Sequence, residues 1–303
     1  MIKYEHIDPK LRLIVIETCN PFYEFDSIKS SKSFHVPSKS LFTMVFLKTK
    51  RKIVITDYMD KSLKVLDING CFQEKISQAG CLEKPWAISS NSRNDIFITD
   101  YEDMGIVKLD SSFKFIRKIG EKVIRNACYM ATDPDNEDIV YLTHYIENRV
   151  TIWNVLENKF INSFGIDTPE FIQIKRNRIF LTSRTEVEYI EGRKEFRRII
   201  EGSNCIFVLS KSNYSLLHAI RIEDWIDPRG LHVDDNLNIL TTAFKLDENN
   251  NRSDWRHLFV INERKSSYTS ICLSGLEVLS DMLMIENKLY FCISDIIEII
   301  TLK

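Results

Sequence analysis

Three tyrosines recur at nearly regular spacing along the chain, at Tyr58, Tyr101 and Tyr145. Each follows a threonine by two residues, so the three occupy equivalent positions of a repeated pattern. Tyrosine combines a large apolar ring with a hydroxyl, which is favoured at protein interfaces, so these residues are candidates for contact with a partner. The alternative is that each ring packs on its own repeat, while Asp57 and Asp100 cap turn amides.

A second group of candidate contact residues falls in two segments that interrupt the regular spacing, at about 184–203 and 245–256. The candidates in these segments are Arg184, Tyr189, Arg193, Lys194, Phe196, Arg197, Arg198 and Trp255. The basic side chains could meet acidic groups or phosphate, and the aromatic rings could stack on bases or pack against a peptide. Glutamates are interleaved with them, so the alternative is a solvated hairpin or short helix with internal ion pairs.

Sequence motifs for catalysis are missing. The chain contains no glycine-rich phosphate loop, no H-E-x-x-H and no G-x-S-x-G. We therefore assign no catalytic residue and expect neither a metal nor a cofactor.

The composition restricts the class of protein further. The chain has 41 Lys and Arg against 43 Asp and Glu, which argues against a surface that is basic overall and built for nucleic acid. Its seven cysteines are scattered and never spaced as C-x-x-C, so we expect reduced thiols. The first ten residues are too polar for a signal peptide, and no apolar run is long enough to span a membrane. We expect a monomer in the cytoplasm, with the nucleus as the alternative.

The threonines belong to a repeat. Short β-branched runs that end in a polar residue occur at 53–57, 96–100, 140–144 and 179–183, with weaker copies at 238–242, 289–293 and 13–17. The threonines of the first four copies lie 43, 44 and 39 residues apart. A four-stranded propeller blade uses about 40–45 residues, so the period predicts an all-β propeller of four-stranded antiparallel blades, forming a single domain over residues 1–303.

Further strands can be placed within each period. Second alternating runs follow at 63–67, 106–110 and 150–154, and third runs at 71–76, 113–120 and 159–165. Segments that begin with proline, at 85–88, 169–172 and 228–234, are expected to be innermost strands of the next blades. We expect Trp86 and Trp153 to pack between blades.

The segments 55–76 and 84–120 resemble NHL repeats, and 148–165 resembles the outer half of a WD repeat. The resemblance is strongest over residues 41–182. It implies an interaction module that binds a protein or peptide, and some NHL domains bind RNA. The chain departs from the NHL pattern because it has only nine glycines, whose place in the turns is mostly taken by Asn, Asp and Ser.

The seven copies favour seven blades over the six usual for NHL domains. The last blade ends after its third strand at 296–301, so residues 2–7 are the candidate fourth strand. If they close the ring in this way, it has six blades and a partial one.

In such blades the turns between the second and third strands open on the same face as the loops that join successive blades; we refer to this as the top face. The three tyrosines and both insertions should share it. The leading hypothesis is therefore a non-enzymatic scaffold that binds a protein or peptide on its top face. The alternatives are an RNA-binding domain of NHL type and a metal-dependent propeller hydrolase, lactonase or lyase. Candidate channel ligands for such an enzyme are His232 with Asp234, and His144 with Glu17.

Overall fold

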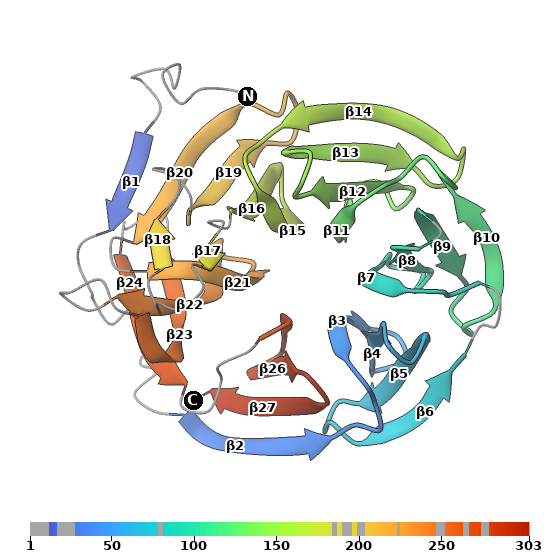
Figure 1. Ribbon diagram of the computed structural model, residues 1–303, viewed down its shortest axis with the longest axis horizontal. Helices are drawn as coiled ribbons and strands as arrows, with labels where there is room; N and C mark the ends of the chain where they lie inside the picture. The colour runs from blue at the N-terminus through green and yellow to red at the C-terminus, as the bar shows by residue number, and fades with distance from the viewer. Residues whose placement is uncertain are drawn as a thin grey trace.

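The computed structural model describes residues 12–16, 28–77, 81–102, 104–183, 187–189, 196–198, 204–222, 225–246, 252–262, 267–273 and 279–302. Six sheets, each with the four antiparallel strands of a blade, form a ring with their innermost strands at its centre (Figure 1); we call this centre the channel. In this part of the chain no helix is long and apolar enough to cross a membrane. The cysteines among these residues are free thiols, as predicted.

The first three blades follow one another directly in the chain, each running from its innermost to its outermost strand. Blade 1 consists of β3 (Leu41–Leu47), β4 (Lys52–Asp57), β5 (Ser62–Asp67) and β6 (Phe72–Ile76). Blade 2 consists of β7 (Pro85–Ser90), β8 (Ile96–Asp100), β9 (Gly105–Leu109) and β10 (Phe115–Ile119). Blade 3 consists of β11 (Ala127–Thr132), β12 (Ile139–His144), β13 (Arg149–Asn154) and β14 (Lys159–Gly165).

The remaining blades carry the additions to this plan. Blade 4 consists of β15 (Pro169–Lys175), β16 (Arg178–Ser183), β19 (Ile206–Ser210) and β20 (Leu216–Ile222), and a fifth strand, β1 (Arg12–Ile16), pairs in parallel with β20. Blade 5 consists of β21 (Trp225–Val233), β22 (Asn238–Leu246), β23 (Arg252–Asn262) and β24 (Ser267–Leu273). Blade 6 consists of β25 (Asp281–Ile285), β26 (Lys288–Ile293), β27 (Ile296–Leu302) and β2 (Ile28–His35).

The expectation of seven blades is wrong, because the ring has six. Six of the seven repeat copies are the second strands of six blades. The seventh copy, at 13–17, corresponds to β1, which has no blade of its own and extends the outer edge of blade 4. A short apolar run can form an inner or an outer strand of a blade, so the run at 13–17 was not by itself evidence for a further blade.

The ring is closed by a strand from the amino-terminal part of the chain. β2 pairs antiparallel with β27, from Ile28 opposite Leu302 to His35 opposite Ile296. Closure from the amino-terminal side was predicted, but with residues 2–7, which lie outside the described residues. The fourth strand of blade 6 is instead 28–35, and this strand makes the sixth blade complete.

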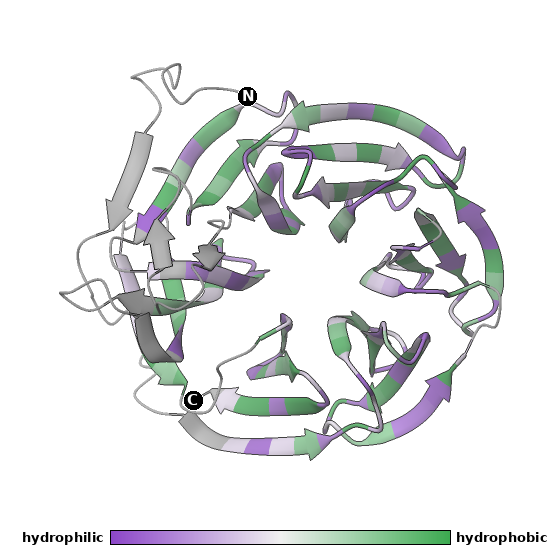
Figure 2. Cartoon of the chain, in the orientation of Figure 1, coloured by the Kyte–Doolittle hydropathy of each residue, from purple (hydrophilic) through white to green (hydrophobic). Residues whose placement is uncertain are grey.

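The core lies between neighbouring blades. All five residues of β8 and of β9 are buried, which explains their nearly continuous apolar sequences, since each blade is covered on both faces. The outer strand β14 is mostly exposed, and hydrophilic residues appear among the hydrophobic ones along the outer strands in Figure 2. Trp153 is buried between blades 2 and 3, as predicted.

The repeated threonines have a defined structural role. The inner strands of the first four blades contain a register shift near their first residues, which leaves a backbone N–H without a ladder partner. The threonine hydroxyl of the second strand accepts that hydrogen bond, from Thr43 N to Thr56 Oγ1 over 3.1 Å and from Tyr129 N to Thr143 Oγ1 over 3.0 Å. The repeat signature therefore marks a hydrogen bond inside each of the first four blades.

Side-chain hydrogen bonds also connect every blade to the next around the channel. From blade 1 onward these bonds are Thr56 Oγ1 to Trp86 O (2.7 Å), Thr132 N to Ser89 Oγ (3.1 Å), Thr143 Oγ1 to Glu170 O (2.8 Å), Val233 N to Gln173 Oε1, Arg229 Nη1 to Leu279 O (3.2 Å) and Met44 N to Asp281 Oδ2 (2.8 Å). The channel wall is thus held by polar contacts as well as by the apolar packing behind it.

Candidate functional site

Four aromatic side chains of blades 1 and 2 form a cluster on the top face; we call Phe42, Tyr58, Trp86 and Tyr101 the top-face aromatic cluster. Trp86 is at its centre, with its ring centroid 4.0 Å from that of Phe42, 5.4 Å from that of Tyr58 and 5.8 Å from that of Tyr101. Phe42, Tyr58 and Trp86 are half-buried, and Tyr101 is 44% exposed. The cluster therefore presents aromatic surface to the outside while its rings support one another.

The backbone beneath the cluster is fixed by two aspartates. The Asp57 carboxylate accepts hydrogen bonds from Lys39 N (2.9 Å) and Ser40 N (3.1 Å). Asp100 in blade 2 accepts from Glu83 N (2.7 Å) in the same way. Each aspartate thus ties the turn after the second strand to the segment that leads into the inner strand, which confirms the interpretation that these carboxylates cap amides.

The structure brings two of the three predicted tyrosines together. Tyr58 and Tyr101 come from different blades and both contact Trp86, whereas Tyr145 is half-buried in the equivalent turn of blade 3. Trp86 packs between blades as predicted, through its contacts with Phe42 and Tyr58 of blade 1, but it was not predicted as a contact residue, and Phe42 was not singled out. Both lie at the start of inner strands, where an aromatic ring contacts aromatic residues of neighbouring blades, and this position is the signal that could have identified them.

The other predicted contact residues lie in the two insertions of blades 4 and 5. Tyr189 ends the short strand β17 (Val187–Tyr189), and Phe196, Arg197 and Arg198 form β18 (Phe196–Arg198), which pairs with it antiparallel. Trp255 lies within β23. The second insertion largely extends two strands of blade 5. β22 continues to Leu246, and β23 begins at Arg252. Arg184, Arg193 and Lys194 lie outside the described residues.

A layer of aromatic rings continues from the cluster across the channel. The ring of Tyr129 lies 5.8 Å from that of Phe42 and 4.0 Å from that of Phe171. The Tyr129 hydroxyl donates a hydrogen bond to Ser280 O over 3.2 Å, so this side chain reaches from blade 3 to blade 6 on the opposite side of the ring. Burial raises the pKa of Tyr129 well above its ordinary value, so this hydroxyl stays protonated. The rings of Tyr129 and Phe171 line one end of the cavity described next.

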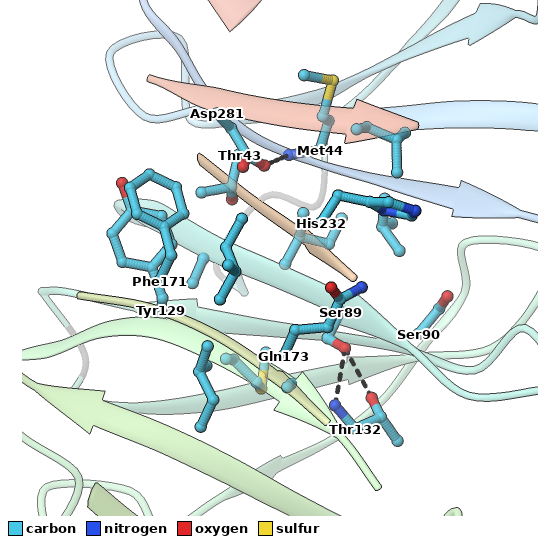
Figure 3. Close-up of a pocket in the computed structure, with 18 of the residues that line it drawn as sticks. Thr43, Met44, Ser89, Ser90, Tyr129, Thr132, Phe171, Gln173, His232 and Asp281 are labelled. Atoms are coloured by element: carbon cyan, nitrogen blue, oxygen red, sulfur yellow. Dashed lines mark hydrogen bonds between the residues drawn. The ribbon is translucent and has the colours of Figure 1, made fainter. Parts of the chain in front are cut away.

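The channel contains a cavity of about 350 Å³, lined by residues of all six inner strands (Figure 3). Asp281 is the one carboxylate among its lining residues. The carboxylate accepts hydrogen bonds from Met44 N and Met282 N, each over 2.8 Å. Burial raises the pKa of Asp281 to about 7, although both amide bonds act in the opposite direction.

Neither of the two predicted channel histidines belongs to a metal-binding cluster among the described residues. Burial, together with the nearby positive charge of Lys175, lowers the pKa of His232 to about 4. The Asp234 carboxylate accepts hydrogen bonds from the backbone amides of Asn236 and Asn238 in the following turn. His144 is buried, with its Nδ1 2.7 Å from Arg125 O and its Nε2 2.7 Å from Thr151 Oγ1. Its predicted partner Glu17 lies outside the described residues. Among the residues described, no group of three or more His, Cys, Asp or Glu side chains is arranged to hold a metal ion.

Solved structures with the same architecture include several enzymes. The chain is similar to hydrazine synthase of Kuenenia stuttgartiensis, with a TM-score of 0.63 at 11% identity over 85% of this chain and 75% of that chain. It is also similar to virginiamycin B lyase from Staphylococcus aureus, with a TM-score of 0.60 at 10% identity over 90% of this chain and 99% of the lyase. A catalytically inactive variant of that lyase with quinupristin gives 0.61 at 10% identity over the same shares.

At these identities the likeness shows the propeller fold alone. No protein-family model matches the chain, and no curated protein sequence does either.

Proposed function

We propose that this propeller is a non-enzymatic binding module that recognises a protein or peptide on its top face. The observation that supports this function is the top-face aromatic cluster, in which two tyrosines from different blades are held beside the half-buried Trp86. Large aromatic residues contribute a disproportionate share of the binding energy at protein interfaces.

The cluster is organised before any partner arrives. The turns that carry Tyr58 and Tyr101 are held by the aspartate caps and by backbone hydrogen bonds from Tyr58 N to Ser40 O (3.3 Å) and from Tyr101 N to Lys84 O (3.0 Å). The Lys84 ammonium also lies 5.6 Å from the centre of the Tyr101 ring. Because little conformational entropy remains to be lost in these turns, contact with a partner costs less free energy.

The charges around the cluster favour a protein over RNA. Lys61 pairs with Glu83 over 2.6 Å, and Lys84 pairs with Glu102 over 3.5 Å, so the rim carries both signs. A mixed polar rim around an aromatic centre is typical of protein interfaces, whereas RNA binding depends on basic side chains that neutralise phosphates.

An enzyme of the hydrolase, lactonase or lyase type would need several carboxylate or imidazole ligands meeting at one point. The described part of the channel offers instead a single carboxylate and an uncharged histidine, on different blades. The geometry therefore supports the binding module better.

The experiment is affinity purification of the tagged chain from cells that express it naturally, with and without ribonuclease. The double variant Tyr58→Ala/Tyr101→Ala is compared with Phe160→Ala, which removes a ring of similar exposure (46%) from the outer strand β14. We expect a specific protein that survives ribonuclease, is retained by Phe160→Ala and is lost in the double variant at unchanged melting temperature. Recovery that depends on RNA, or that is equal in both variants, would reject the proposal.

A further inference from the structure

We propose that the channel cavity binds a small organic ammonium ion, with its cationic group against Asp281 and the neighbouring aromatic rings and its apolar part along the cavity wall. This site is separate from the proposed protein-binding surface, because the ring of Tyr129 and its neighbours lie between the cavity and the top-face aromatic cluster.

The cationic group is assigned from the surroundings of Asp281. Asp281 is half-buried in the channel wall, and the backbone amides of Met44 and Met282 donate hydrogen bonds to its carboxylate. In the described part of the chain no Lys, Arg or His side chain forms an ion pair with it; the nearby Arg229 pairs with Asp227 instead. A carboxylate can accept more than two hydrogen bonds, and an ionised carboxylate without a counter-charge is unfavourable inside a protein. A bound cation would supply both the additional donor and the counter-charge.

Two aromatic rings contribute to the same end of the cavity. Tyr129 and Phe171 lie at the same level of their inner strands as Asp281 does in its own. The Tyr129 hydroxyl donates a hydrogen bond to the carbonyl oxygen of Ser280, the residue before Asp281. Figure 3 shows both rings and Asp281 lining the one cavity. Aromatic faces attract ammonium groups, and the attraction grows when water is excluded.

The surroundings of Asp281 suit an organic cation better than a calcium or magnesium ion. Calcium takes six to eight oxygen ligands and magnesium needs near-octahedral coordination, whereas the cavity lining supplies one carboxylate. A monovalent organic cation needs only the carboxylate and the ring faces.

The remainder of the cavity determines the shape of the ligand. Its lining combines polar residues such as Ser89, Thr132 and Gln173 with the apolar residues Met44, Ile88, Met130, Ile172, Leu231 and Met282. A volume of about 350 Å³ is near the lower limit for ligand pockets, so the occupant is a small molecule with a short alkyl or aryl body. A primary amine with such a body would place its cationic group against Asp281 and its body among these residues.

Binding of this cation should depend on pH in a defined way. Lys48, which directly follows β3, lines the same cavity, and Glu170 on β15 lies near Tyr129 and Arg229. The ionisable groups on the elements packed around Asp281 are Cys292 on β26, Tyr129 on β11, and Arg229 and His232 on β21, while β3 carries none. Burial raises the pKa of Cys292 and of Tyr129, the pKa of Arg229 is raised by Asp227, and the pKa of His232 is about 4. Between pH 6 and 8, Asp281 is therefore the group among these that titrates.

The test is isothermal titration of the full chain with hexylamine, 1-hexanol and hexanoate, which share one body and differ in charge. We expect hexylamine to bind about tenfold or more tightly than 1-hexanol, and hexanoate to bind least. Because the cation prefers the ionised carboxylate, the affinity for hexylamine should be about tenfold weaker at pH 6 than at pH 8, with a proton released on binding.

Variants locate the site. Asp281→Asn should abolish the preference for hexylamine over 1-hexanol, and Ser90→Ala, at another part of the lining, should retain it. If Asp281→Asn does not fold, the comparison of charge and pH in the wild-type chain decides alone. Equal affinity for hexylamine and 1-hexanol, or hexylamine binding that is independent of pH between 6 and 8, would overturn the proposal, whatever the outcome for the top face.

Discussion

Replacing Thr143 by valine should destabilise the propeller although the two side chains have nearly the same shape. Thr143 is fully buried, its hydroxyl accepts a hydrogen bond from Tyr129 N over 3.0 Å, and it donates to Glu170 O in blade 4 over 2.8 Å. The substitution removes both bonds and leaves no room for water to replace them.

The magnitude follows from those two bonds. Depriving a buried polar group of its partner costs about 1–3 kcal/mol, and two backbone groups are affected, while the added methyl group returns about 1 kcal/mol. We therefore expect Thr143→Val to lower the free energy of unfolding by about 1–5 kcal/mol. Thr143→Ser keeps the hydroxyl and loses only a methyl group, so its cost should be about 1 kcal/mol.

The assay is reversible urea unfolding followed by tryptophan fluorescence, with both variants measured at the same pH and salt. The diagnostic quantity is the difference between the valine and serine variants, because it isolates the hydroxyl from the packing. If valine were no more destabilising than serine, the threonine hydroxyls would not be what connects the blades, and the role assigned to the repeat signature would be wrong.

Other perturbations test other parts of the molecule. Gly70→Ala should lower the free energy of unfolding by about 1–3 kcal/mol in the urea assay, because Gly70 has a φ of 84° and a Cβ there would lie 2.8 Å from the Phe34 ring of the closing strand β2. The raised pKa of Asp281 means that folding takes up a proton, so the free energy of unfolding should fall as pH rises from about 4 to about 7. Asp281→Asn should remove that slope. The pKa of Asp60 is shifted in the opposite direction, because Lys64 and Lys75 hold it well below the ordinary value. The free energy of unfolding should therefore fall as pH falls below about 4, and this fall should be smaller in Asp60→Asn.

Most of the fold could be predicted because propeller strands are buried between blades. Two covered faces require short apolar runs such as 53–57 and 96–100, and each run is followed by further strands within the same period. The run at 13–17 has the same composition but lacks those followers, and counting it produced the wrong blade number. Which amino-terminal segment would close the ring could not be decided, since 28–35 is a polar sequence whose partner strand is at the other end of the chain.

The site was predicted only in part, because it depends on contacts between blades. Tyr58 and Tyr101 could be recognised from their repeated positions, but their meeting at Trp86 requires the register of two inner strands. Asp281 could not be recognised at all. In blade 6 the position of the repeated threonine is taken by Cys292, and the carboxylate of Asp281 makes the connection to blade 1 instead.

The central claim, that the top face binds a protein, is tested most directly by placing the photo-reactive residue p-benzoylphenylalanine at position 101 and, as a control, at position 160. Both native side chains are exposed to a similar extent, 44% for Tyr101 and 46% for Phe160, so simple accessibility is matched. The account predicts that irradiation in cells links position 101 to one defined protein and leaves position 160 without that product. Labelling of RNA at position 101, or the same products from both positions, would contradict it.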